Sequence, residues 1–387
     1  MNDIGNWNYP TAIRFGVGRI TELPDACLEL NIHRPLLVTD PILAKLPITQ
    51  QALQAVRSKG LHCGLFSDMQ SNPVGRDVDA GVLALKKGKH DGVIAFGGGS
   101  ALDVAKAVAL MAHQVRPLWD FEDIGDYWTR VDESAMVPCV AVPTTSGTGS
   151  EVGRCSVIIN ENERKKALIF HPKMLPEKVI ADPGLTLDLP AKITAAVGMD
   201  ALSHNLEAFC APGYHPQADG IALEGMRLVH RSLVAAYRDG QNRSARSDMM
   251  AASLMGATAF QKGLGAMHAM SHPLGAHLNA HHGLTNAIVM PYVLHRNRVA
   301  IEEKMDALAR YLQLNGSGTD AVIEWVLSLR ETLNIPHTLG AIGVEEHHCQ
   351  QLAPHSVQDP TAGGNPISLR VDEYEKLYRD ALLGRME

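Results

Sequence analysis

The sequence predicts two domains, an N-terminal α/β domain built on a parallel sheet and a C-terminal domain made of helices alone. A chain of 387 residues with 45% hydrophobic side chains can bury a large core but exceeds the usual size of one domain. Short apolar segments alternate with helical segments in the first half, which is typical of a parallel sheet covered by helices. After about Leu187, Ala, Leu, Met and His dominate segments of helical periodicity. We therefore place the domains at 1–187 and 188–387, with a short hinge near 182–189.

The individual elements follow from the same patterns. Three candidate strands recur at intervals of roughly thirty residues, the length of a βαβ unit. The candidate strands are 35–39, 62–66, 92–96 and 137–142, with helical spacing of apolar residues at 48–58 and 76–87. Candidate helices of the second half are 191–210, 216–238, 247–262, 301–312 and 371–383.

Composition excludes several classes of partner. The net charge of −7 comes from 42 acidic and 35 basic residues without a long basic tract, so we expect no nucleic-acid partner. The start of the chain, Met1 to Asn6, has neither a basic nor an apolar region, so we expect no secretory signal and a cytoplasmic protein. The cysteines lie far apart without a C-x-x-C pair, which favours reduced, buried thiols over disulfides or a zinc knuckle.

The segment 263–295 contains no Asp, Glu, Lys or Arg. Six histidines, two prolines and several glycines interrupt it, and these would be costly in a membrane. We therefore expect a segment buried inside the protein rather than a membrane span. Buried imidazoles need polar partners, and a metal ion is one such partner.

Two loops in the first half are suited to phosphate and ribose groups. Strand 92–96 leads into Gly97-Gly98-Gly99-Ser100 and then into a helical stretch, where backbone N–H groups and the helix dipole favour a phosphate. A second loop rich in hydroxyls and glycine, 143–151, follows strand 137–142. Each loop alone is also compatible with a simple turn or a polar surface loop. Because ligands bind at the carboxyl ends of parallel strands, the two loops together predict a dinucleotide site of the Rossmann type.

Asp40 closes the strand 35–39. A carboxylate at this position can accept hydrogen bonds from ribose hydroxyls and would repel a 2′-phosphate, which favours NAD over NADP. An Asp before a proline is equally typical of an ordinary turn.

Candidate metal ligands lie in the second half. Asp200 and His204 are four residues apart in a helix with apolar neighbours, so both side chains lie on one buried face. The charge-free segment adds further candidates, and spacing alone leaves open which of them bind: His268, His272, His277, His281 and His282. One carboxylate with several imidazoles suits Zn²⁺ or Fe²⁺ better than Mg²⁺ or Ca²⁺.

Several motifs occur in a characteristic order. They are Gly97-Gly98-Gly99-Ser100 with Asp103 and Lys106, the loop 143–151, the helix segment 198–204, and the segment 268–275 leading to His282-Gly283. Together they resemble the iron-containing (group III) alcohol dehydrogenase family, which includes lactaldehyde reductases and propanediol dehydrogenases. The resemblance covers nearly the whole chain.

The resemblance implies roles for individual residues. The family's metal ligands match Asp200, His204, His268 and His282, and His272 matches a catalytic, non-ligand histidine linked to proton transfer near the nicotinamide. The NAD-binding positions match Asp40, Asn72, Gly98, Gly99, Ser100, Thr144, Thr145, Thr148 and Lys166. The implied cofactors are NAD and one divalent metal, with Fe²⁺ favoured and Zn²⁺ as the alternative.

Three features depart from the family pattern. His277 stands where relatives often have an aromatic residue, and His281 adds an imidazole beside a ligand. The closing motif 359–366 lacks a cysteine that some members place in the pocket. These departures leave the substrate open.

We therefore expect an NAD-dependent alcohol dehydrogenase or aldehyde reductase that acts as a homo-oligomer, such as a homodimer, and has no membrane partner. A hydroxyacid-oxoacid transhydrogenase with bound nicotinamide is one alternative. A dehydroquinate-synthase-like lyase is another, but it would need pocket lysines and arginines, and 263–295 has none. A non-catalytic metal-binding protein would leave both cofactor loops without a purpose.

Overall fold

The chain folds into two compact units. The computed structural model describes residues 9, 11–163 and 165–386. The α/β unit comprises 9–145 and 149–188, and the helical unit comprises 189–386 together with Ser146–Thr148. The expectation of no secretory signal rests on Met1 to Asn6, which lie outside the described residues.

The α/β unit is built on a six-stranded sheet in the order β1-β8-β5-β4-β2-β3, in which every pair of neighbours is parallel. The strands are β1 (Ala12–Phe15), β2 (Pro35–Val38), β3 (Gly64–Phe66), β4 (Gly92–Gly97), β5 (Cys139–Pro143) and β8 (Lys178–Ala181). Strands β2, β4 and β5 are buried along their whole length, as expected for strands covered on both faces. The predicted fold class is therefore confirmed, although β1 and β8 were not predicted.

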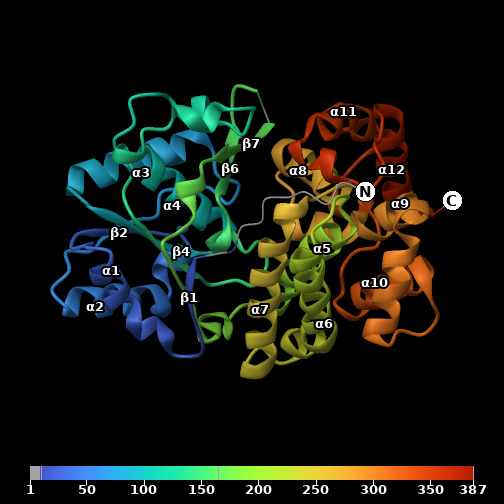
Figure 1. The fold of residues 1–387 in the computed structure, drawn as a ribbon, viewed down its shortest axis with the longest axis horizontal. Helices are drawn as coiled ribbons and strands as arrows, with labels where there is room; N and C mark the ends of the chain where they lie inside the picture. The colour runs from blue at the N-terminus through green and yellow to red at the C-terminus, as the bar shows by residue number, and fades with distance from the viewer. Residues whose placement is uncertain (1–8, 10, 164, 387) are drawn as a thin grey trace. The chain divides into compact units, whose positions relative to one another are not determined.

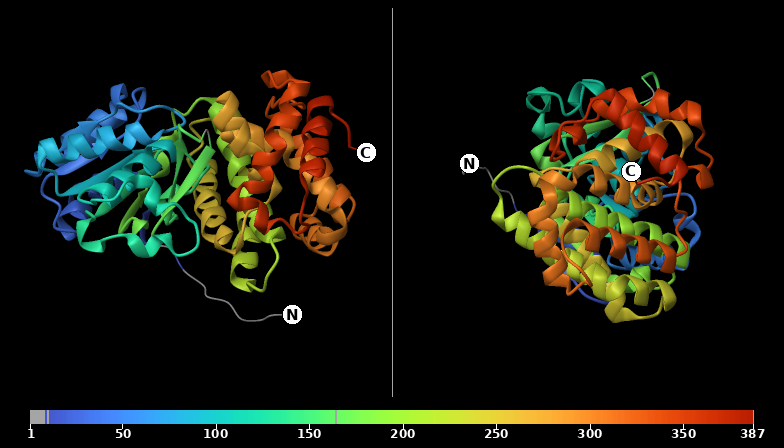
Figure 2. Two further views of the ribbon diagram at one scale, coloured as in Figure 1. Left: turned by 90° about the horizontal axis from the view of Figure 1, so that it is seen from above. Right: turned by 90° about the vertical axis from the view of Figure 1, so that its right-hand side faces the viewer.

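Helices flank this sheet (Figures 1 and 2). They are α1 (Leu23–Glu29), α2 (Pro47–Ser58), α3 (Gly75–Gly88) and α4 (Gly99–Met111). Apolar side chains of α1 and α2 pack in one cluster with Ile94, Phe96 and Val140 of the central strands. An antiparallel hairpin, β6 (Cys155–Asn160) and β7 (Lys165–Phe170), completes the unit and was also not predicted.

The second unit is all-helical, as the sequence predicts. Its helices are α5 (Ala191–Cys210), α6 (Pro216–Arg238), α7 (Arg243–Ala259), α8 (Ala266–Leu278), α9 (His282–Leu312), α10 (Gly318–Thr332), α11 (Glu346–Gln358) and α12 (Val371–Leu383). The predicted helices 191–210, 216–238 and 371–383 have the observed bounds. Two others were misplaced, because 301–312 is only the last part of α9 and 247–262 includes a short 3-10 turn, η9 (Phe260–Lys262), after α7. Within the described ranges, no helix is both long and apolar enough to cross a membrane.

Helix α5 is the central helix of this unit and packs against α6, α7 and α9. Small residues allow the close approach of the helices. A Cβ atom at Gly198 would lie 2.2 Å from Leu233 Cδ1 of α6, and a Cβ at Gly283 would lie 2.4 Å from the Ala196 carbonyl oxygen. The contact of Gly283 with α5 brings the start of α9, and with it His282, next to Asp200.

Candidate metal centre and cofactor loops

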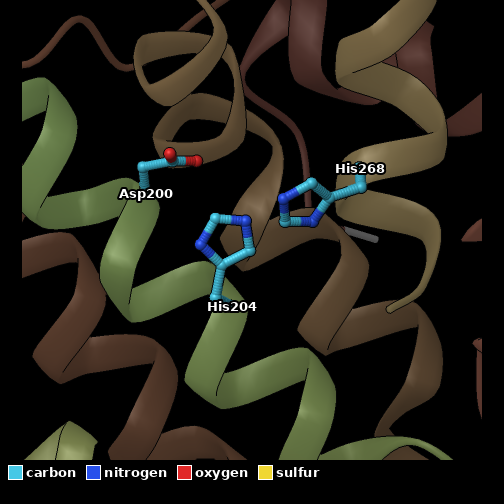
Figure 3. Close-up of side chains that lie close together, drawn as sticks. All are labelled: Asp200, His204 and His268. Atoms are coloured by element: carbon cyan, nitrogen blue, oxygen red, sulfur yellow. The ribbon is translucent and has the colours of Figure 1, made fainter. Parts of the chain in front are cut away.

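Three predicted metal ligands converge inside the helical unit. The ligand atoms of Asp200 and His204 from α5 and of His268 from α8 lie within 4.8 Å of one another (Figure 3). Their side chains are buried, with exposed fractions of 2%, 4% and 1%. The one-turn spacing of Asp200 and His204 places both on the same face of α5, toward α8.

The fourth predicted ligand, His282, is the first residue of α9. Its Nε2 lies 3.6 Å from Asp200 Oδ1, and its ring centroid lies 5.2 Å from that of His268. The structure therefore groups three of the predicted ligands tightly and places the fourth, His282, beside Asp200 and His268.

These residues fit a divalent cation. Three imidazoles and one carboxylate form a donor set suited to Fe²⁺ or Zn²⁺. One turn after His282, the Asn286 amide nitrogen lies 2.9 Å from Asp200 Oδ1, 3.2 Å from His282 Nε2 and 3.3 Å from His268 Nε2. The amide oxygen of Asn286 is buried with no hydrogen-bond partner in the part of the chain that the structure describes. Acceptor atoms that crowd together in a buried site favour a bound cation.

The environment shifts the pKa values of two imidazoles in opposite directions. Burial lowers the pKa of His204 to about 4, which keeps this ring neutral at physiological pH. A neutral imidazole is the form that binds a metal. Burial also acts to lower the pKa of His268, but the charge of Glu207 and its hydrogen bond outweigh burial and raise that pKa.

Carbonyl and carboxylate partners orient the ligand rings. Nδ1 of His268 donates to Glu207 Oε2 at 2.6 Å, and the other oxygen of Glu207 accepts the Met267 N–H at 2.6 Å. Nδ1 of His204 lies 3.3 Å from the Gly147 carbonyl oxygen. Because Nδ1 is engaged in both rings, Nε2 is left to bind a metal. Sequence analysis missed Glu207, although its position three residues after His204, on the same helix face, was an available signal.

The predicted catalytic histidine, His272, lies beside the ligands. Its ring stacks on that of His282, with centroids 5.3 Å apart and an interplanar angle of 19°. Its Nδ1 hydrogen-bonds to Asp359 Oδ2 at 2.8 Å. The two unusual histidines are both exposed: the His277 ring lies 4.6 Å from that of His355 on α11, and His281 immediately precedes α9.

The two predicted cofactor loops lie together at the carboxyl ends of β4 and β5. Gly97 ends β4 with a φ of 150°, and a Cβ atom there would lie 2.7 Å from Ala101 Cβ at the start of α4. Thr144 N donates to the Gly97 carbonyl at 2.9 Å, and a Cβ atom at Gly98 would lie 3.3 Å from the Thr145 side chain. Glycine is therefore needed where α4 begins, and the helix N-terminus stays accessible to a phosphate.

Asp103 and Lys106 of α4 hold the second loop in place. Asp103 accepts hydrogen bonds from Ser150 Oγ at 2.5 Å and from Val157 N at 3.1 Å. The buried Lys106 ammonium donates to the Ser150 carbonyl at 2.9 Å and to the Cys155 carbonyl. These two motif residues therefore fasten the segment 150–157 to the helix that follows the glycine loop.

The remaining predicted cofactor residues are distributed as follows. Asp40 Oδ1 accepts the N–H groups of Ile42 and Leu43, both at 2.9 Å, so the turn interpretation is confirmed and a ribose contact stays a prediction. Ser100 Oγ donates to the carbonyl of Ser71, next to Asn72, at 2.5 Å. Lys166 of β7 pairs with Ile159, which is bridged to Val74, so Lys166 lies one strand away from the Asn72 segment. Thr148 belongs to the 146–148 segment of the helical unit.

Known proteins match this chain along nearly its whole length. Residues 10–183 match the family model described as iron-containing alcohol dehydrogenase, and residues 194–382 match that of the C-terminal part of the Fe-containing alcohol dehydrogenase family. A 4-hydroxybutyrate dehydrogenase of Cupriavidus necator is 38% identical over 384 residues, which covers 97% of this chain and 99% of that protein.

Solved structures also match nearly the whole chain. A 1,3-propanediol oxidoreductase has a TM-score of 0.93 at 32% identity and covers 98% of this chain and 100% of its own. A sulfoacetaldehyde reductase of Bifidobacterium kashiwanohense, solved in complex with NAD⁺, has a TM-score of 0.88 at 29% identity and covers 98% of each chain.

A parallel α/β unit with a glycine loop, and a helical unit in which Asp200, His204 and His268 converge, are typical of a metal-containing dehydrogenase. The matches in sequence and structure agree with this class. The chain belongs to the iron-containing alcohol dehydrogenase family, which confirms the resemblance and the predicted enzyme class.

Proposed function

We propose that this protein interconverts a small alcohol and its aldehyde or ketone with NAD, at a divalent metal held by Asp200, His204, His268 and His282. The observation that carries the proposal is the convergence of the buried Asp200, His204 and His268, with the half-buried His282 lying 3.6 Å from Asp200. When bound, the metal supplies a Lewis acid that favours the alkoxide over the alcohol, and the nicotinamide supplies or accepts the hydride.

The protein's own residues prepare this site for the reaction. Desolvation keeps His204 neutral, and Glu207 holds the His268 proton on Nδ1, so both rings offer Nε2 to the metal. We assign to His272 the exchange of a proton with the substrate oxygen, because its ring stacks on that of the proposed ligand His282.

The α/β unit binds the dinucleotide in this proposal. Gly98, Gly99 and Ser100 at the N-terminus of α4 would hold the pyrophosphate. The carboxylate of Asp40 would contact a ribose, and the other cofactor contacts would come from Asn72, Thr144, Thr145, Thr148 and Lys166. Two relatives support NAD as the nucleotide: the reductase solved with NAD⁺, and an NAD-dependent methanol dehydrogenase of Bacillus methanolicus that is 32% identical.

The test combines metal reconstitution with a substrate panel. Protein reconstituted with Fe²⁺ or Zn²⁺ is assayed with NAD and NADP on short-chain alcohols and hydroxy acids, which the similarity to a 4-hydroxybutyrate dehydrogenase makes worth including. His268→Ala should abolish metal-dependent turnover while NAD binding persists. His277→Ala, on the same helix but exposed, is the matched control. Full activity after removal of the metal would contradict the proposal, and absence of net NADH from alcohol alone would favour a transhydrogenase.

We further propose a cytoplasmic homo-oligomer. The described structure contains six free cysteines and no disulfide, as expected for thiols in a reducing compartment. Strand β1 is at a sheet edge, and its Phe15 is exposed, a combination that often pairs with a second copy. Light scattering of the purified protein measures its mass in solution. The mass of a single chain would contradict this proposal.

A further inference from the structure

We propose that Asp359 is a positioning residue that fixes the imidazole tautomer of His272, so that Nδ1 carries the proton and Nε2 exchanges a proton with the substrate. The inference rests on the role proposed above for His272. It also gives a function to the closing motif 359–366, which the metal centre and the cofactor loops leave unexplained.

Asp359 is itself held in place from one side. It lies between α11 and the short turn η11 (Pro360–Gly364), for which it is the N-terminal cap. Its Oδ1 accepts the Thr361 N–H at 2.9 Å and the Thr361 hydroxyl at 2.5 Å. The second oxygen, Oδ2, faces His272 Nδ1 at 2.8 Å.

This arrangement allows only one hydrogen-bond direction toward His272. An ionised carboxylate accepts hydrogen bonds and cannot donate, so Nδ1 must be the protonated ring nitrogen. The backbone N–H and the hydroxyl of Thr361 both donate to Oδ1, and these hydrogen bonds favour the ionised form of Asp359. The proton-free Nε2 is then the atom that can accept a proton during alcohol oxidation and return it during aldehyde reduction.

The neighbours of His272 hold its ring in one orientation, so the nitrogen that carries the proton decides which nitrogen can react. His272 is 6% exposed, and its ring stacks on His282 and meets the His268 ring edge-on at a centroid distance of 5.9 Å. A ring fixed among ligand side chains cannot rotate freely to present its other nitrogen. Asp359 directly follows α11, which packs against α8, the helix that carries His272 (Figure 1).

Asp359→Asn is the decisive substitution, because the structure fixes the orientation of the new amide. The Thr361 N–H is a backbone donor that cannot reverse, so the amide oxygen must face it. The amide NH₂ group then faces His272 Nδ1 and donates to it, which moves the ring proton to Nε2. A base that is already protonated at the reacting nitrogen cannot accept the substrate proton.

We expect Asp359→Asn to lower kcat for alcohol oxidation by about 100-fold or more, the range for loss of general base catalysis. Metal content and the Kd for NAD should stay unchanged. A second readout does not depend on turnover: ¹⁵N NMR of Zn²⁺-loaded, histidine-labelled protein, with the His272 signals assigned by their loss in His272→Gln. Nδ1 should change from protonated in the wild type to unprotonated in Asp359→Asn.

Two further variants separate positioning from stability. Thr361→Val removes the hydroxyl bond to Asp359 but keeps the backbone donor, so the tautomer should persist and kcat should fall by less than about 10-fold. Ser356→Ala removes a different buried hydrogen bond of α11, from Ser356 to Tyr378, and should leave the tautomer and kcat unchanged.

The proposal is overturned if wild-type His272 carries its proton on Nε2, a measurement that needs no variant to fold. It is also overturned if Asp359→Asn keeps wild-type kcat, or if Ser356→Ala loses as much activity. A wild-type protein that oxidises no alcohol would instead contradict the proposed function, while the tautomer measurement would still decide the role of Asp359.

Discussion

Replacing Glu207 by glutamine should weaken the metal centre, although the two side chains have nearly the same shape. The Met267 N–H, 2.6 Å from Glu207 Oε1, can only donate, so the glutamine amide must place its oxygen there. The amide NH₂ group then faces His268 Nδ1, where a carboxylate oxygen now accepts at 2.6 Å. The ring proton would move to Nε2, which is the nitrogen needed by the metal.

The magnitude follows from the role of such partners. Loss of a hydrogen bond to a ligating histidine typically lowers metal affinity about 10- to 100-fold, or about 1.4 to 2.7 kcal/mol. Glu207→Ala should fall near the lower end, because the His268 ring remains free to protonate Nδ1. Glu207→Gln should reach about 100-fold, because it also stabilises the tautomer that cannot bind. The expected order of metal affinity is wild type, then alanine, then glutamine.

Competition with a coloured chelator measures these affinities for Zn²⁺ and Fe²⁺ directly. Ser203→Ala is a matched control, since it removes a buried hydrogen bond of α5 to the backbone carbonyl of Asp200 without touching a ligand side chain. The tautomer argument would be wrong if the glutamine variant bound metal as tightly as the wild type, or more tightly than the alanine variant.

Three further predictions concern stability. Burial raises the pKa of Glu151 from 4.5 to about 7, so the protonated form stabilises the fold fully below pH 4.5. About 3 kcal/mol of the free energy of unfolding is lost as the pH rises through 7. Glu151→Gln should remove this loss, and equal urea-unfolding curves of both proteins at pH 8.5 would contradict the assignment. Gly283→Ala would place a Cβ 2.4 Å from the Ala196 carbonyl oxygen, and should cost about 1–3 kcal/mol and weaken metal binding, as calorimetry and chelator competition would show. A chelator should lower the melting temperature of the wild type but hardly that of His268→Ala; equal shifts would argue against the site.

Much of the fold was predictable because it depends on local periodicity. Helices α5, α6 and α12 have the predicted bounds, since a regular apolar pattern and a proline or polar start define each end. The four strands first proposed are apolar runs followed by turns. Strands β1 and β8, of four residues each, were missed because so short a segment shows no clear pattern. The hairpin of β6 and β7 was also missed, because its apolar residues are consecutive in the sequence and the alternation of buried and half-buried side chains is visible only in the structure.

The sequence by itself determined which residue types are available for chemistry: a glycine loop after a strand, a carboxylate and an imidazole one helical turn apart, and a charge-free segment rich in histidine. Only the tertiary structure decided which side chains orient those imidazoles. Glu207 and His268 are 61 residues apart and Asp359 and His272 are 87 residues apart, so no local pattern links them. Such pairs form only when α5 meets the start of α8 and the residue after α11 meets the middle of α8, because hydrogen-bond geometry depends on distance in space and not on distance along the chain.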